Sequence, residues 1–198
     1  GLSFLASYAA QAGLFPLELR LAAVAAAGIA LLVVGFLRRQ AKPDFALALQ
    51  GTGVAVIYLT IFAAARLFEL MPLFPALGLM LLVCALGCAL ALLQGSQALA
   101  FAAFAGGFAA PVLLGGEGSA TGLFAYFAIL NLAVLALVWR KGWRAIAVLA
   151  FVATFGVMAA WVGTSYQVAD YAVAQAFLAV FVLVHLGNAI LVAGPRPG

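Results

Sequence analysis

Long apolar runs separated by short polar breaks dominate the chain. Eight runs stand out: residues 2–14, 21–37, 45–65, 73–93, 98–114, 120–139, 145–163 and 172–192. A transmembrane helix needs about 20 mostly apolar residues, whereas a transmembrane β-strand needs about 10 residues of alternating polarity. Because these runs are long and apolar on all sides, they predict an all-α, polytopic bundle of about eight transmembrane helices.

The breaks between the runs carry the chemistry of turns. Pro16 and Pro72 each disfavour helix at the residue before them. Residues 38–44 and 140–144 form short basic loops, and residues 115–119 are rich in glycine. Such short connections make successive helices antiparallel neighbours, so we expect residues 1–198 to form a single transmembrane domain.

Composition narrows the class of protein further. The 198 residues are 69% hydrophobic and 7% charged, whereas a soluble domain is about 25% charged. So few charged side chains cannot cover a soluble globule, which excludes a cytosolic enzyme, a nucleic-acid-binding module and a disordered chain. The expected partner is the lipid bilayer, and no nucleic acid is expected.

The basic residues predict the orientation of the spans. If the loop at Arg38 faces the cytoplasm and the spans alternate, the outer side receives only Arg20 and Arg66. The cytoplasmic side then receives the other seven basic residues: Arg38, Arg39, Lys42, Arg140, Lys141, Arg144 and Arg196. Cytoplasmic loops of membrane proteins carry such an excess, so we expect both chain ends to be cytoplasmic.

The two ends of the chain suggest a piece of a longer protein. The sequence starts at Gly1 inside an apolar run and stops in the loop-like residues 194–198. Further membrane helices of the same longer chain are therefore expected partners. The sequence gives no indication of oligomeric state.

Several stretches resemble a known family in the same order along the chain. They are LQGTG at 49–53, YLT at 58–60, GGFAAP at 106–111, LFAY at 123–126 with Asn131, WRKGWR at 139–144 and Thr154-Phe155. Together they resemble the bacterial predicted membrane protein family called domain of unknown function 2339. The resemblance implies a multi-pass protein of the bacterial inner membrane and supplies no reaction.

The fifth run contains the strongest candidate for a functional element. Pro111 has no N–H, so the carbonyl of Gly107 loses its helical partner, and Gly106 and Gly107 soften the backbone beside it. A broken helix at membrane depth exposes backbone dipoles to a solute, as in many transporters. The alternative is a kink that lets helices pack closely.

Polar side chains inside the spans are the other candidates. His185 and Asn188 lie three residues apart and share a face of the last span. An intramembrane histidine suggests a proton relay or ligand contact, or a neutral ring bonded to another span, with Asn131, Tyr126, Gln50 or Thr154 as partner. Gln50 and Asn131 can likewise line a polar path or form interhelical hydrogen bonds.

Small residues on two spans indicate packing faces instead of sites. Cys84 and Cys88 lie one helical turn apart, without a standard zinc spacing. Ala22, Ala26 and Ala30 form a similar ridge on the second span. No cofactor and no metal site are expected.

Two classes of function remain open at this stage. One is a transport-like domain for a small solute or lipid, supported by the Gly-Gly-Pro segment and the scattered polar residues. The other is a non-catalytic scaffold within a large envelope protein, supported by the absence of acidic or basic residues at mid-span except His185. A membrane-embedded enzyme ranks third, because the outer loops are too short to hold a site of their own.

Overall fold

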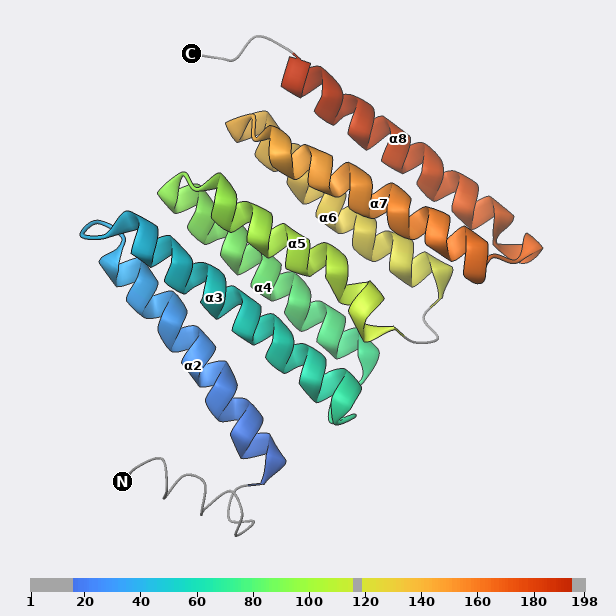
Figure 1. The fold of residues 1–198 in the computed structure, drawn as a ribbon. Helices are drawn as coiled ribbons and strands as arrows, with labels where there is room; N and C mark the ends of the chain where they lie inside the picture. Colours follow the sequence, from blue (N-terminus) through green and yellow to red (C-terminus); the bar gives the residue numbers. More distant parts are fainter. Residues whose placement is uncertain (1–15, 116–118, 194–198) are drawn as a thin grey trace. The chain divides into compact units, whose positions relative to one another are not determined.

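A computed structural model describes residues 16–115 and 119–193, and these residues are helical apart from short connections (Figure 1). The helices, in chain order, are α2 (Leu17–Arg38), α3 (Pro43–Phe62), the π-helical turn η1 (Ala63–Leu67), α4 (Leu73–Gln94), α5 (Gln97–Leu114), α6 (Ala120–Lys141), α7 (Arg144–Thr164), the 3-10 turn η2 (Val168–Asp170) and α8 (Tyr171–Ala193). In the described part of the chain, seven helices are long and apolar enough to cross a membrane. The all-α membrane fold is thereby confirmed, and the run at 2–14 lies outside the described residues.

The chain divides into two compact units between Leu70 and Met71. The first unit holds α2, α3 and η1, and the second holds α4 to α8. Each unit is described by itself, and the single domain spanning 1–198 stays a prediction.

Glycines hold the two helices of the first unit together. A Cβ on Gly53 would lie 2.7 Å from the carbonyl oxygen of Gly28, and a Cβ on Gly28 would lie 2.8 Å from Ile57. Near the turn, a Cβ on Gly35 would lie 2.8 Å from the carbonyl oxygen of Ala46. Backbones can approach this closely only where side chains are missing, and membrane helices associate through such contacts.

The alanine ridge expected on α2 is not the packing face. Ala22, Ala26 and Ala30 are exposed, whereas Gly28, Leu32 and Gly35 are the buried residues of α2. Within the first unit the prediction was wrong, because alanine still carries a Cβ and the closest approach to α3 occurs where α2 has none.

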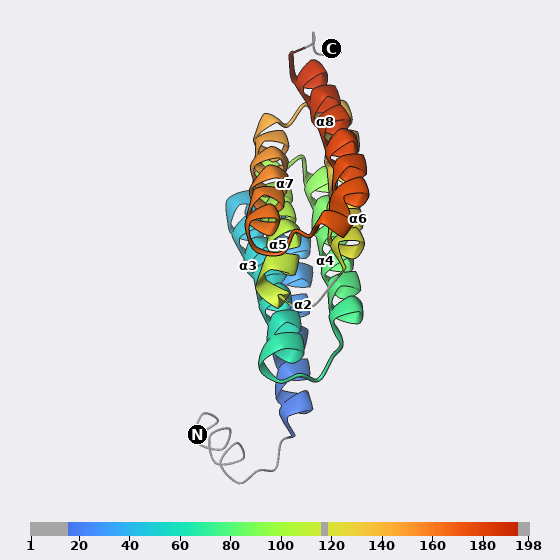
Figure 2. The ribbon, with the colours of Figure 1, turned by 90° about the vertical axis from the view of Figure 1, so that its right-hand side faces the viewer.

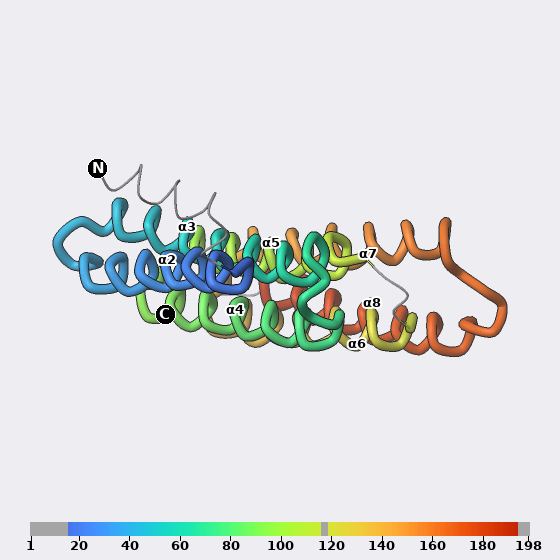
Figure 3. Tube along the Cα trace, turned by 90° about the horizontal axis from the view of Figure 1, so that it is seen from below, coloured from blue at the N-terminus to red at the C-terminus, as the bar shows by residue number. Residues whose placement is uncertain are grey.

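The second unit is a two-layer arrangement of antiparallel helices. Figures 2 and 3 show α5 beside α7 in one layer and α4, α6 and α8 in the other. Helix α6 contacts α8 within one layer. Contacts across the two layers join α4 to α5 and α6 to α7. The starts of α4, α6 and α8 therefore lie at the same end as the finishes of α5 and α7.

Short caps set the helix ends of this unit. Gly95 and Gly142 adopt left-handed conformations, with φ of 63° and 64°, and each ends a helix. Ser96 and Ser119 begin the helices that follow by accepting hydrogen bonds from the backbone N–H of Leu99 and Gly122. Glycine is the residue that adopts a positive φ without strain, and serine is a favoured N-cap, so local sequence fixes these ends.

Candidate functional site

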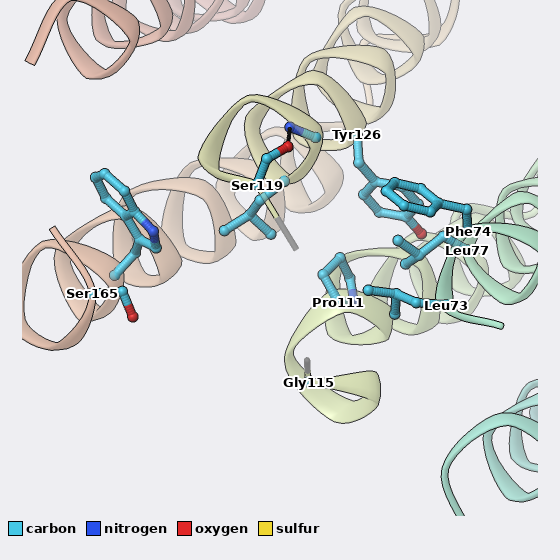
Figure 4. Close-up of a pocket in the computed structure, with 11 residues that line it drawn as sticks. Leu73, Phe74, Leu77, Pro111, Gly115, Ser119, Tyr126 and Ser165 are labelled. Carbon is cyan, nitrogen blue, oxygen red and sulfur yellow. Dashed lines mark hydrogen bonds between the residues drawn. The ribbon is translucent and has the colours of Figure 1, made fainter. Parts of the chain in front are cut away.

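A cavity of about 360 Å³ opens at one end of the second unit (Figure 4). We call it the Pro111 cavity. Its lining residues come from four helices and their ends: Leu73, Phe74, Leu77, Pro111, Gly115, Ser119, Gly122, Leu123, Tyr126, Trp161 and Ser165. By the orientation predicted from the basic residues, this end is the outer one.

The carbonyl group that Pro111 leaves without an amide is bonded by a side chain of the next helix. The Tyr126 hydroxyl of α6 donates a hydrogen bond of 2.8 Å to the Gly107 carbonyl oxygen of α5. Tyr126 is buried, and its ring also lines the cavity. Tyr126 therefore lies in the wall of the cavity, and its hydroxyl takes the place of the N–H that Pro111 lacks.

The broken helix expected at Pro111 is not observed. Helix α5 continues from Gln97 through Pro111 to Leu114 before Gly115 ends it. Continuity costs little here because the Tyr126 hydroxyl satisfies the freed carbonyl and only three helical residues follow the proline.

The two glycines of the segment differ in their surroundings. Gly107 is buried, and a Cβ there would lie 3.1 Å from the sulfur of Cys84 on α4 and 3.4 Å from Leu130 on α6. Gly106 is half-buried. Gly107 and Cys84 therefore serve close packing of α5 against α4, which agrees with the packing role expected for Cys84.

The chemistry of the Pro111 cavity is apolar with a few hydroxyl groups. Leucine, phenylalanine and tryptophan side chains form most of the wall, and Ser119, Ser165 and Tyr126 supply oxygen atoms. No lining residue carries a charge. From Ser119 to Tyr126 the cavity extends about 10 Å along α6, roughly a third of that helix.

A tightly packed layer lies deeper in the unit. Phe104, Phe108 and Phe127 are buried and pack with their rings tilted, and the ring centroids lie 6.3 Å apart for Phe104 and Phe108 and 5.6 Å apart for Phe108 and Phe127. At the same depth, Asn131 Nδ2 of α6 donates to the hydroxyl of Thr154 on α7 at 2.8 Å and to the Phe127 carbonyl at 2.9 Å. Asn131 thus makes an interhelical hydrogen bond in the core, one of the two roles considered for it.

His185 is buried, as expected, but its neighbours are aromatic. Its ring lies 5.4 Å from those of both Phe151 and Phe155 on α7, measured between centroids. Its Nε2 has no hydrogen-bond partner among the described residues. The partners proposed on α6 and α7 are bonded elsewhere: Tyr126 donates to Gly107, and Asn131 donates to Thr154.

Asn188 shares the side of α8 that His185 uses. Both residues line a groove of about 300 Å³ between α7 and α8, which we call the His185 groove. The other lining residues are Arg144, Ala147, Val148, Phe151, Ala189 and Val192. The groove lies at the opposite end of the unit from the Pro111 cavity.

Gln50 belongs to the first unit. It is fully buried, and its side chain packs against Gly35, where a Cβ would meet Gln50 Cγ at 2.7 Å. Thr60 of the same helix bonds its own backbone, donating to the Val56 carbonyl at 2.7 Å. Gln50 therefore contributes to the α2–α3 contact, while Asn131, His185 and Asn188 belong to the second unit.

Sequence reasoning missed most of the lining of the Pro111 cavity. Phe74, Trp161, Ser119 and Ser165 were not considered as binding groups. These residues lie near the ends of three helices, α4, α6 and α7, that meet only in the folded unit. Across residues 16–115 and 119–193, no three His, Cys, Asp or Glu side chains come close enough to hold a metal ion.

Comparisons with known proteins give one match. The family model described as predicted membrane protein (DUF2339) matches residues 1–196. Neither the curated proteins nor the solved structures include a significant match to the chain.

Proposed function

We propose that the second unit of this chain, which belongs to the DUF2339 family of predicted membrane proteins, is a transport-like domain that binds a small, uncharged amphipathic solute or lipid in the Pro111 cavity. The cavity itself is the observation that carries this proposal. Its volume of about 360 Å³ falls within the range of ligand sites, and such sites are mostly apolar with a few placed polar groups.

The polar groups of the cavity favour a ligand with hydroxyl or carbonyl groups. The Tyr126 oxygen uses its proton on Gly107 and keeps lone pairs that can accept. Ser119 accepts from the backbone N–H of Gly122, and its own hydroxyl proton can be donated. An ion would find no opposite charge among the lining residues, so a neutral amphipathic molecule fits the chemistry better.

Passage through the unit requires a change in the packed layer. Phe108, Phe127 and the Asn131–Thr154 hydrogen bond lie between the Pro111 cavity and the His185 groove. In a transport cycle these contacts would separate and the cavity would become continuous with the other side, as alternating access demands.

The scaffold function is the second candidate, and the exposed surface of α2 favours it. Only Gly28, Leu32 and Gly35 of this helix are buried within the chain. Its remaining apolar face is available to lipid or to other membrane helices. In this role the chain would hold further helices together and the Pro111 cavity would bind nothing selectively.

Tryptophan fluorescence can test the cavity directly. The chain has three tryptophans, and replacing Trp139 and Trp143 by Phe leaves Trp161 in the cavity wall as the only tryptophan, which can be excited apart from the tyrosines. Titration with a brominated medium-chain alcohol should then quench Trp161 saturably, as a bound ligand does, in addition to the linear quenching expected from alcohol dissolved in the micelle.

A matched pair of glycine variants supplies the control. Gly122→Leu places a side chain in the cavity, where a Cβ would lie 3.2 Å from the Ser119 hydroxyl oxygen and 3.9 Å from Phe74, and should remove the saturable quenching. Gly78→Leu makes the same change on α4, where nothing lies within 4 Å, and should leave the quenching intact. Quenching that is only linear in all three proteins would contradict a ligand site.

A flux measurement separates transport from scaffolding. Proteoliposomes containing the chain should move a fluorescent short-chain phosphatidylcholine between leaflets faster than protein-free vesicles, and Gly122→Leu should slow that movement. Saturable binding without faster movement would favour the scaffold, with the cavity as a structural lipid site.

A further inference from the structure

Two neighbouring side chains of α8 bury polar atoms without a hydrogen-bond partner in the described chain. They are Nε2 of His185 and both amide atoms of Asn188. Asn188 is only 2% exposed. Buried polar groups in proteins are nearly always paired, because an unpaired one loses its hydration and gains nothing. These atoms lie directly beneath the surface of the His185 groove, and a rotation of the Asn188 side chain would bring its amide to a polar molecule bound there.

The walls of the groove favour an acyl chain. Ala147, Val148 and Phe151 of α7 face Ala189 and Val192 of α8 across it. The side chains of His185 and Asn188 form part of its floor, with their unpaired polar atoms directly beneath the surface. The groove is open along one side, so in a membrane its contents come from the surrounding lipid. An apolar channel with an unpaired amide directly beneath its floor matches a molecule whose tail is apolar and whose linkage is polar, with the Asn188 side chain turned toward that linkage.

The mouth of the groove carries positive charge. Arg144 lines it, and one guanidinium nitrogen, Nη2, donates to the Val192 carbonyl at 3.1 Å. A guanidinium has five N–H donors, so others remain for a phosphate group. Arg140 and Lys141 end the preceding helix, and the only acidic residue from Ser119 to Ala193 is Asp170, at the far end of the unit.

The depths of these groups match the parts of a phospholipid. Measured along α8 from Val192, Asn188 lies about 6 Å deeper and His185 about 10 Å deeper. The headgroup and interfacial layer of a bilayer is about 5–8 Å thick on each side. A phosphate at Arg144 therefore places the glycerol ester carbonyls, which accept hydrogen bonds, at the level of Asn188 Nδ2.

We infer that the His185 groove is a binding site for an anionic phospholipid, with the phosphate on Arg144, an ester carbonyl on Asn188 and an acyl chain along Val148 and Phe151. Basic pockets between transmembrane helices on the cytoplasmic side bind anionic headgroups in this way. The site is separate from the Pro111 cavity and does not depend on the function proposed for it.

Lipid binding to the purified chain tests the inference. Native mass spectrometry in detergent can follow titration with phosphatidylglycerol and with phosphatidylcholine of the same acyl chains. Wild-type protein should bind phosphatidylglycerol more tightly. Arg144→Gln should weaken phosphatidylglycerol about fivefold, the contribution of one basic residue near an anionic headgroup, and phosphatidylcholine less, because the choline cation offsets the charge of the same phosphate group. Inorganic phosphate should not compete, because the groove selects the whole lipid.

Asn188→Leu distinguishes a ligand contact from a structural residue. The change removes the unpaired amide at similar side-chain volume, so the lipid-free protein should melt at the same or a higher temperature. Binding of both lipids should weaken, because both have ester carbonyls. A lower melting temperature with unchanged lipid binding would identify Asn188 as a structural residue and overturn the inference.

Two control variants lie outside the groove. Arg66→Gln removes an exposed basic residue of the first unit, and Gln175→Leu removes an exposed amide of α8 near the opposite end. Both should bind lipid as the wild type does. Equal affinity for the two lipids, or equal binding by the wild type and Arg144→Gln, would overturn the anionic site. Disulfide cross-linking of Val148→Cys to a second copy, at a yield independent of lipid, would show that protein occupies the groove instead.

Discussion

The Tyr126 hydroxyl donates its hydrogen bond to Gly107, whose carbonyl oxygen is the one that Pro111 leaves without an amide. Proline removes one donor from α5, and a side chain on α6 replaces it at 2.8 Å. The carbonyl that proline frees is therefore satisfied by a hydrogen bond between two helices, and the helix need not break. Both Pro111 and Tyr126 line the same cavity, so this attachment also shapes the candidate binding site.

Removing the Tyr126 hydroxyl should destabilise the second unit. Tyr126→Phe leaves the Gly107 carbonyl buried without a partner, at an expected cost of about 1–3 kcal/mol in the free energy of unfolding. Pro111→Ala restores an N–H that can donate to the same carbonyl. In the Pro111→Ala background, Tyr126→Phe should therefore cost less, with a coupling free energy of at least about 0.5 kcal/mol. Reversible unfolding in mixed micelles measures the cycle, and strictly additive costs would rule out the replacement.

The glycine contact of the first unit should tolerate no added methyl group. In Gly53→Ala the new Cβ would meet the Gly28 backbone oxygen, which cannot move without shifting α2, so unfolding should become easier by about 1–3 kcal/mol. Gly51→Ala is the matched control on the same helix, because nothing lies within 4 Å of that position. The control should be neutral or stabilising by up to about 1 kcal/mol. Thermal melts of both variants check this, and equal losses would exclude a specific contact.

The hydrogen bond between Asn131 and Thr154 should contribute modestly to stability. Thr154→Val removes the acceptor at nearly constant volume, while Asn131 keeps its bond to the Phe127 carbonyl. Interhelical hydrogen bonds in membranes contribute about 0.6 kcal/mol on average and rarely exceed about 1.7 kcal/mol, so a loss in that range is expected. Thr164→Val is the control, since the exposed Thr164 hydroxyl donates to Ala160 of its own helix. Losses of the same size in both would show that the interhelical bond contributes nothing.

The predicted orientation can be checked by cysteine labelling. In a chain with Cys84 and Cys88 replaced by alanine, cysteines at Gln40 and Gly142 should react with a membrane-impermeant maleimide only after the cytoplasmic side is opened. A cysteine at Gln167, which precedes η2, should react from the outside in intact cells. The reverse pattern would invert the assignment of both the Pro111 cavity and the His185 groove.

The helices themselves could be predicted closely from the sequence. Each described helix lies within a few residues of an apolar run, and the run at 73–93 differs from α4 by one residue. The reason is physical: a membrane helix must satisfy its backbone internally, so its length follows the bilayer and its ends follow polar residues and caps. Gly95, Ser96 and Gly142 are caps of this kind.

The choice of packing face could not be predicted in the same way. Lipid is as apolar as a protein core, so hydrophobicity does not distinguish the side of α2 that carries Ala22 from the side that carries Gly28. The continuity of α5 through Pro111 depends on Tyr126, a residue of another helix. The aromatic neighbours of His185 likewise come from α7, and only the folded unit brings them together.

The two-residue turns described above determine where the chain can be cut. Gly95 and Ser96 alone separate α4 from α5, and Gly142 and Trp143 alone separate α6 from α7. Arg140, Lys141 and Arg144 are sites for trypsin by sequence, yet all three lie within helix ends beside the second turn. A protease cleaves segments that can unfold locally and become extended. A turn of two residues is too short to do so unless the helices on either side unwind. In open membrane vesicles the stretch from α6 to α7 should therefore persist as an intact helical hairpin under trypsin, whereas the stretch from α4 to α5 offers trypsin no Lys or Arg to cut.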